Sequence, residues 1–75
     1  MKELVEFIVK SLVDDPTQVE VSEVQHDRTL ILKLRVAPED MGRVIGKSGR
    51  VINAIRALLR VAAARDGRRV DLEVD

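Results

Sequence analysis

Apolar residues recur at every second position in two segments of the chain. Residues 29–36 (TLILKLRV) and residues 69–74 (RVDLEV) alternate in this way, and residues 18–25 (QVEVSEVQ) alternate in part. A period of two is typical of a strand with one buried face. The pattern therefore predicts a strand in each of these segments. The side chains expected to face the core are Leu30, Leu32, Leu34, Val36, Val70, Leu72 and Val74.

Two longer segments, residues 2–13 (KELVEFIVKSLV) and residues 50–64 (RVINAIRALLRVAAA), have the spacing of amphipathic helices. The first is expected to end before Pro16, because proline disfavours helical backbone in the residue before it. The second is expected to end before Gly67. A short helix is expected to start at Pro38, with acidic residues at the positive end of its dipole. The apolar side chains expected to pack on the core are Leu4, Val5, Phe7, Ile8 and Leu12 in the first helix and Val51, Ile55, Leu58, Leu59 and Ala62 in the second.

The predicted elements follow the order α-β-β-α-α-β within a single domain, residues 1–75. This order indicates an α+β fold in which helices cover one face of a three-stranded sheet. A chain of 75 residues buries roughly 60% of the surface that its unfolded form exposes. The core is therefore thin, and it leaves little room for a deep active site.

The composition argues against metal, disulfide and catalytic chemistry. The chain has no cysteine and a single histidine, His26, so it offers neither a thiolate metal site nor a histidine cluster. No nucleophile–base pair is visible either, and we expect no catalytic residue, no metal and no cofactor. No apolar run reaches the ~18 residues that a membrane span requires. We expect a soluble, cytoplasmic protein.

The formal net charge is zero, but the charges are segregated along the chain. Residues 1–40 carry five basic and nine acidic side chains, whereas residues 41–69 carry eight basic and one acidic. A basic block of this kind attracts polyanions even when the total charge is zero. The alternative is a solvated helix face, which the spacing of Arg56 and Arg60 favours. Three further arginines of the block flank a predicted turn and are Arg65, Arg68 and Arg69.

The basic block contains the run MGRVIGKSGR, residues 41–50. Its glycines and lysine partly match the phosphate-binding loop of nucleotide hydrolases, G-x-x-x-x-G-K-[ST]. Only three residues separate Gly42 from Gly46, so the loop is one residue short, and it follows a predicted helix instead of a strand. These departures argue against nucleotide hydrolysis.

Two other interpretations of Gly46-Lys47-Ser48-Gly49 remain open. The two glycines let the backbone turn sharply and present bare amides at the start of the next helix, where a sugar-phosphate backbone can approach. Lys47 and Arg50 would then add positive charge for phosphates. Alternatively, the motif is a tight corner between two helices that binds nothing.

The run VIGKSGRVI, residues 44–52, resembles the signature of KH domains, which is an isoleucine, a GxxG loop and a spaced isoleucine. The order α-β-β-α-α-β resembles the type II, prokaryotic arrangement of that domain. The longer run PEDMGRVIGKSGRVINAIRALLRVAA is similar to the KhpA family of small bacterial proteins with a single KH domain. The resemblance covers essentially the whole chain.

The resemblance implies a non-catalytic protein that binds single-stranded RNA. KH domains hold about four nucleotides, and their GxxG loop clamps the sugar-phosphate backbone. Carried over to this sequence, the clamp consists of Gly46, Lys47, Ser48 and Gly49. Ile45 and Ile52 are expected to line the groove for the bases, the core, or both. The expected contacts at the rim of the groove are Arg43, Arg50 and Arg35.

The resemblance also implies partners. A chain similar to KhpA is expected to form a homodimer, or a heterodimer with a larger KH-containing protein, and to act in RNA-level regulation as an RNA chaperone. Phe7 is the only aromatic residue, and we expect it in the core. Base stacking is then lost, so a single copy should bind RNA weakly and with strong salt dependence, and dimerisation should add affinity. The alternative function is a protein-interaction or dimerisation module with little RNA affinity of its own.

Overall fold

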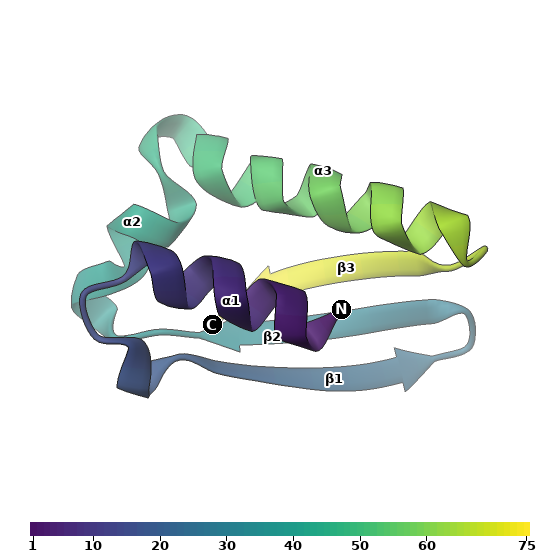
Figure 1. Cartoon of the computed structure of the whole chain (residues 1–75), viewed down its shortest axis with the longest axis horizontal. Coiled ribbons are helices and arrows are strands. Elements are labelled where there is room, and N and C mark those ends of the chain that lie inside the picture. The colour runs from purple at the N-terminus through teal and green to yellow at the C-terminus, as the bar shows by residue number, and fades with distance from the viewer.

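The order of helices and strands in the protein is the predicted α-β-β-α-α-β (Figure 1). The structure is a computed structural model that describes every residue from Met1 to Asp75. The elements are α1 (Lys2–Leu12), β1 (Glu20–His26), β2 (Thr29–Arg35), α2 (Met41–Ile45), α3 (Arg50–Arg65) and β3 (Arg69–Val74). Short 3₁₀ turns are η1 (Pro16–Gln18), η2 (Pro38–Asp40) and η3 (Lys47–Gly49). None of the helices combines the length and the apolar character that crossing a membrane requires.

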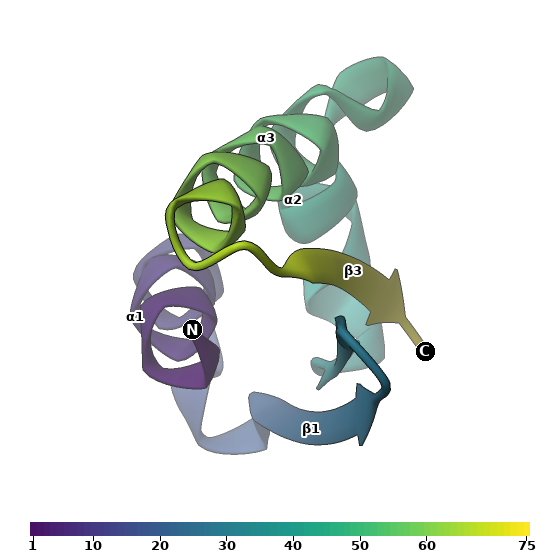
Figure 2. The same ribbon diagram turned by 90° about the vertical axis from the view of Figure 1, so that its right-hand side faces the viewer.

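The strands form one mixed sheet with the spatial order β1-β2-β3. β1 and β2 are an antiparallel hairpin, and β3 pairs with β2 in parallel, with Leu72 beside Leu32. Figures 1 and 2 show all the helices on one face of this sheet. The predicted α+β fold with one covered face is therefore confirmed, and it is consistent with a type II KH fold.

The core lies between the sheet and the helices, and the strand periodicity predicted its sheet side correctly. Leu32 and Leu34 on the central strand have no exposed surface. Val74, at the end of β3, is half-buried against the core. The other predicted strand residues that are buried are Leu30, Val36, Val70 and Leu72.

The helix boundaries are close to the predicted ones, but the buried faces of the helices differ from the prediction. In α1 the buried residues are Val5 and Val9. Phe7, which was predicted in the core, is 71% exposed, and Leu58 of α3 is 58% exposed. The buried face of α3 consists of Ile52, Ile55, Leu59 and Ala63. The core predictions that are wrong are those for Leu4, Phe7, Leu12 and Leu58.

The physical reason for these wrong core predictions is the number of apolar positions on each helix. Both helices carry an apolar arc that is wider than the strip a single sheet can cover, so helical spacing alone does not indicate which part of the arc is buried. In α3 the buried strip is centred on Leu59, and Leu58 lies beyond its edge.

The buried carboxylate of Asp40 holds the end of α1 to the start of α2. Its Oδ1 and Oδ2 atoms accept hydrogen bonds of 3.1 Å from the amides of Asp14 and Asp15. Asp40 is 2% exposed, and a carboxylate buried to this degree is costly unless such partners satisfy it. The contact fixes the place where α2 begins, and with it the place of the glycine motif that follows.

We expect Leu59→Ala to lower the free energy of unfolding by about 2–5 kcal/mol, because the truncation leaves a cavity in the core. Leu59 is 1% exposed. Leu58→Ala, compared at a protein concentration where the chain is monomeric, is the matched control and should stay within about 0.5 kcal/mol of the wild type, since its side chain faces solvent in the single chain. Urea denaturation followed by circular dichroism measures both. Equal losses would mean that α3 packs on the sheet with a different face.

Candidate nucleic-acid interface

The GxxG loop joins α2 to α3 through a turn with positive φ at three of its four residues. Gly46 has φ 77° and ψ 170°, Ser48 has φ 57° and ψ 26°, and Gly49 has φ 75° and ψ 15°. The backbone region of Gly46 is one that essentially only glycine adopts. The predicted connection of two helices through these glycines is confirmed.

The backbone of Gly46 packs directly against the start of α3. A Cβ atom at this position would lie 2.5 Å from Cγ2 of Val51 and 2.8 Å from its backbone nitrogen, closer than real contacts. At Gly49 a Cβ would meet Nδ2 of Asn53 at 3.4 Å, so only the positive φ restricts that position. Gly42 has open space around it. The turn therefore requires the glycines of the motif, and Gly46 most of all, but not Gly42.

The turn begins with the amides of Lys47 and Ser48. The first N–H groups of a helical turn have no partner within that turn, and the bonds that close η3 come from the amides of Gly49 and Arg50, to the carbonyl oxygens of Gly46 and Lys47. The side chains of Lys47 and Arg50 are exposed, and neither forms an ion pair. These groups lie at the N-terminal end of α3, where the helix dipole is positive. The first amides of the turn, two cations and a helix start form a site that suits an anion such as a phosphate.

The other two predicted rim arginines, Arg43 and Arg35, each form an ion pair with an acidic residue. Nη2 of Arg43, on α2, is 3.1 Å from Oδ2 of Asp14. Arg35, at the end of β2, is paired with Asp75 at 3.7 Å. The alternation along β2 puts Arg35 on the sheet face that the helices leave uncovered. Of the predicted rim arginines, the structure brings only Arg50 to the loop without an acidic partner.

Ile45 and Ile52 flank the loop and contact the core. Ile52 is 3% exposed and belongs to the core cluster, whereas Ile45 is half-buried and packs against that cluster. Ile52 therefore positions α3 on the sheet. Ile45 retains some exposed apolar surface beside the loop.

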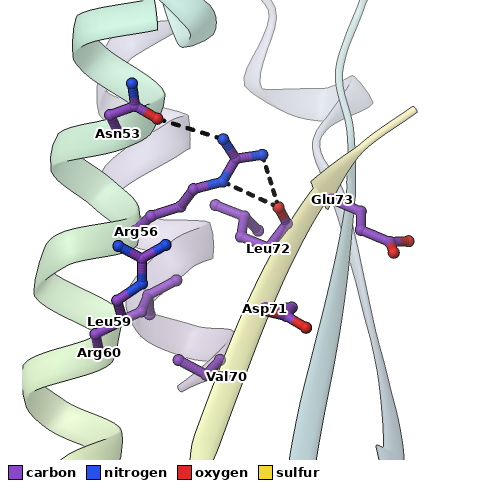
Figure 3. Close-up of a pocket in the computed structure, with 8 residues that line it drawn as sticks. All are labelled: Asn53, Arg56, Leu59, Arg60, Val70, Asp71, Leu72 and Glu73. Atoms are coloured by element: carbon purple, nitrogen blue, oxygen red, sulfur yellow. Dashed lines mark hydrogen bonds between the residues drawn. The ribbon is translucent and has the colours of Figure 1, made fainter.

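A groove of about 330 Å³ continues from the loop between α3 and β3 (Figure 3). Asn53 lines its end nearest the loop, and Nδ2 of Asn53 is 3.4 Å from the place of a Cβ at Gly49. The polar side chains of α3 that line it are Asn53, Arg56 and Arg60. Asp71 and Glu73 line it from the edge strand β3. No aromatic residue lines the groove, since Phe7 lies on α1.

Arg56 bridges the groove and is half-buried, not a freely solvated side chain. Its Nε and Nη2 donate to the carbonyl oxygen of Leu72 at 3.2 and 3.0 Å, and its Nη1 donates to Oδ1 of Asn53 at 3.4 Å (Figure 3). The guanidinium thus satisfies a carbonyl of an edge strand and ties α3 to β3. Sequence reasoning missed this role, because nothing local to Arg56 indicates a partner in a distant strand.

Comparison with known proteins agrees with this geometry. The sequence model of the family described as KhpA/KhpB, KH domain, matches residues 2–74. The chain is 54% identical over 74 residues to the RNA-binding protein KhpA of Clostridium acetobutylicum, covering 99% of each chain. It is 51% identical over 74 residues to the RNA-binding protein KhpA of Chlamydia trachomatis, covering 99% of this chain and 95% of the relative. It is 49% identical over 72 residues to the protein of that name from Borreliella burgdorferi.

Gly46→Ala should lower the free energy of unfolding. A non-glycine residue in this backbone region costs about 1–3 kcal/mol, and the close contact of its Cβ with Val51 adds to that cost. Gly42→Ala is the control. It should be neutral or stabilise by roughly 0.5–1 kcal/mol, because it replaces a glycine in a helix with space around it. Thermal and urea unfolding measure both variants. A Gly46→Ala protein as stable as Gly42→Ala would contradict the described turn.

Proposed function

Because the chain belongs to the KhpA/KhpB KH-domain family, we propose that it binds single-stranded RNA by clamping the sugar-phosphate backbone with its GxxG loop. The family is one of non-catalytic RNA-binding proteins, so the chain is not an enzyme. The observation that carries the proposal is that the amides of Lys47 and Ser48 begin a helical turn beside two unpaired cations, Lys47 and Arg50. A structural corner alone requires none of these groups.

In this proposal, each part of the loop contributes one function. Gly46 and Gly49 present no side chain, so a phosphate can approach the backbone closely. The amides of Lys47 and Ser48 donate hydrogen bonds to phosphate oxygens, and the hydroxyl of Ser48 adds a further donor. Lys47 and Arg50 supply the charge that makes binding dependent on salt. The bases then point toward Ile45 and the groove between α3 and β3.

Arg43 and Arg35 remain predicted contacts with RNA. Each forms an ion pair with an acidic residue, Asp14 or Asp75, and would exchange that partner for a phosphate. We therefore expect both to contribute less than Arg50, which has no such partner.

The second part of the proposal is self-association, or pairing with a larger KH-containing protein. Leu58 and Val61 of α3 and Leu4 and Phe7 of α1 are large apolar side chains that the single chain leaves exposed. The groove has no aromatic residue for stacking, so one copy is expected to bind RNA weakly. Two linked copies on one RNA gain affinity through effective concentration. The proposed setting is RNA-level regulation in the cytoplasm, with RNA chaperone activity.

The test of the clamp is the double variant Lys47→Asp with Ser48→Asp. We expect it to bind labelled single-stranded RNA at least tenfold more weakly, a loss of about 1.4 kcal/mol or more, because carboxylates replace the phosphate contacts. Fluorescence anisotropy at several salt concentrations measures binding. The wild type should show an affinity that falls with salt.

The chain offers a matched control for this variant. Lys10 and Ser11 are the same pair of residues at the end of α1, so Lys10→Asp with Ser11→Asp makes the same change of charge away from the loop. This variant, checked by circular dichroism to be folded, should bind RNA nearly as the wild type does. If both variants bind alike, or if the wild type does not bind RNA, the loop is a structural corner and the dimerisation function becomes the better proposal.

Self-association is tested by placing a charge on α3. Leu58→Asp should move the protein toward the monomer in sedimentation velocity, because a carboxylate is costly to bury in an apolar contact. Val24→Asp, at an exposed apolar residue on β1, is the control and should leave the oligomeric state unchanged. A wild type that is monomeric at all concentrations would refute self-association and leave pairing with a larger KH-containing protein as the second part of the proposal.

A further inference from the structure

At the end of α3 opposite the GxxG loop, arginine side chains line two adjoining hollows. Arg60, Arg68 and Arg69 line one of about 240 Å³, and Arg28 and Arg69 line the other. These residues come from α3, the turn before β3, the start of β3 and the β1–β2 turn. We call the two together the distal arginine hollows.

None of these arginines has an acidic partner. The ion pairs of the structure involve no arginine beyond Arg35 and Arg43. The acidic residues that line the hollows, Asp27 and Asp71, are outnumbered by the four arginines. Unpaired cations gathered in a concave surface attract polyanions more strongly than the same charges spread over a convex one.

The distal arginine hollows are continuous with the groove that starts at the loop. The groove and the first hollow share Arg60, Val70 and Asp71. α3 has 16 residues, so the path along its flank from the loop to the hollows is about 24 Å long. A strand that leaves the clamp and follows the groove therefore reaches the distal arginines.

We propose that the RNA site extends past the about four nucleotides that a KH groove holds, and that the distal arginine hollows bind further phosphates of the same strand. This inference rests on the proposed function. Guanidinium groups suit phosphates because their planar donors match phosphate oxygens. Contacts to the backbone carry no base information, so the extension should add affinity without sequence preference.

The experiment compares a four-nucleotide RNA with one of about twelve nucleotides, long enough to follow α3 to its end. The distal variant is Arg68→Ser with Arg69→Ser. A control with the same loss of charge is Lys2→Ser with Lys10→Ser, on α1. Affinity and its salt dependence are measured by anisotropy for the full chain, after circular dichroism has shown that each variant is folded.

We expect all three proteins to bind the short RNA alike. For the long RNA, the distal variant should bind more weakly than the wild type and the α1 control. Its salt slope should fall by about 1.4, since each lost phosphate contact on a single strand lowers the slope by roughly 0.7.

The inference is overturned if the distal variant binds the long RNA with the affinity and slope of the wild type. It is also overturned if the α1 control loses as much, because the effect would then be one of total charge. A protein partner at the hollows would give the first of these results. Failure of the clamp itself would be distinguishable, since the Lys47→Asp, Ser48→Asp variant would then bind the short RNA like the wild type.

Discussion

The approach of the Gly46 backbone to Val51 is the constraint on which the RNA-facing half of the molecule depends. A residue with a side chain would meet Val51 at less than contact distance, so α2 and α3 can join at this angle only through glycine. The same turn seats Ile52 in the core, which fixes α3 on the sheet. It also places the next two amides, those of Lys47 and Ser48, at the start of a helical turn, where N–H groups have no partner within the turn. The stability of the helix junction and the availability of donors for a phosphate therefore have one cause.

The basic side chains that form ion pairs and most of those that do not lie in different parts of the chain. In the acidic first part of the chain, Lys10 and Arg35 are paired, and Arg43 of α2 reaches back to Asp14 of the same part. From Lys47 onward no basic side chain forms an ion pair with a carboxylate. A chain with no net charge thus gathers most of its unpaired cations on α3 and its flanking turns, whereas the β3 wall of the groove carries Asp71 and Glu73.

Local patterns predicted the strands, the helix order and the loop, because each depends on residues that are close in sequence. Alternation in β2 indicates a buried face for Leu32 and Leu34, and the glycine spacing indicates a turn between helices. The patterns failed where burial depends on the rest of the molecule. Phe7 and Leu58 are apolar and helical, yet the sheet is too narrow to cover them. The partners of Arg56 and Arg43 were unpredictable for the same reason, since each lies on a distant segment.

A contact between two copies through the exposed Leu58 of α3 is compatible with access to the groove, because the two lie on different sides of the helix. Arg56 and Leu58 are two positions apart, which places their side chains about 200° apart around the helix. Arg56 faces β3 across the groove, so Leu58 faces away from it. Contact between two copies through Leu58 would therefore leave both grooves open. A dimer of this kind would hold two sites on one RNA without covering either, and effective concentration would then supply affinity that aromatic stacking does not.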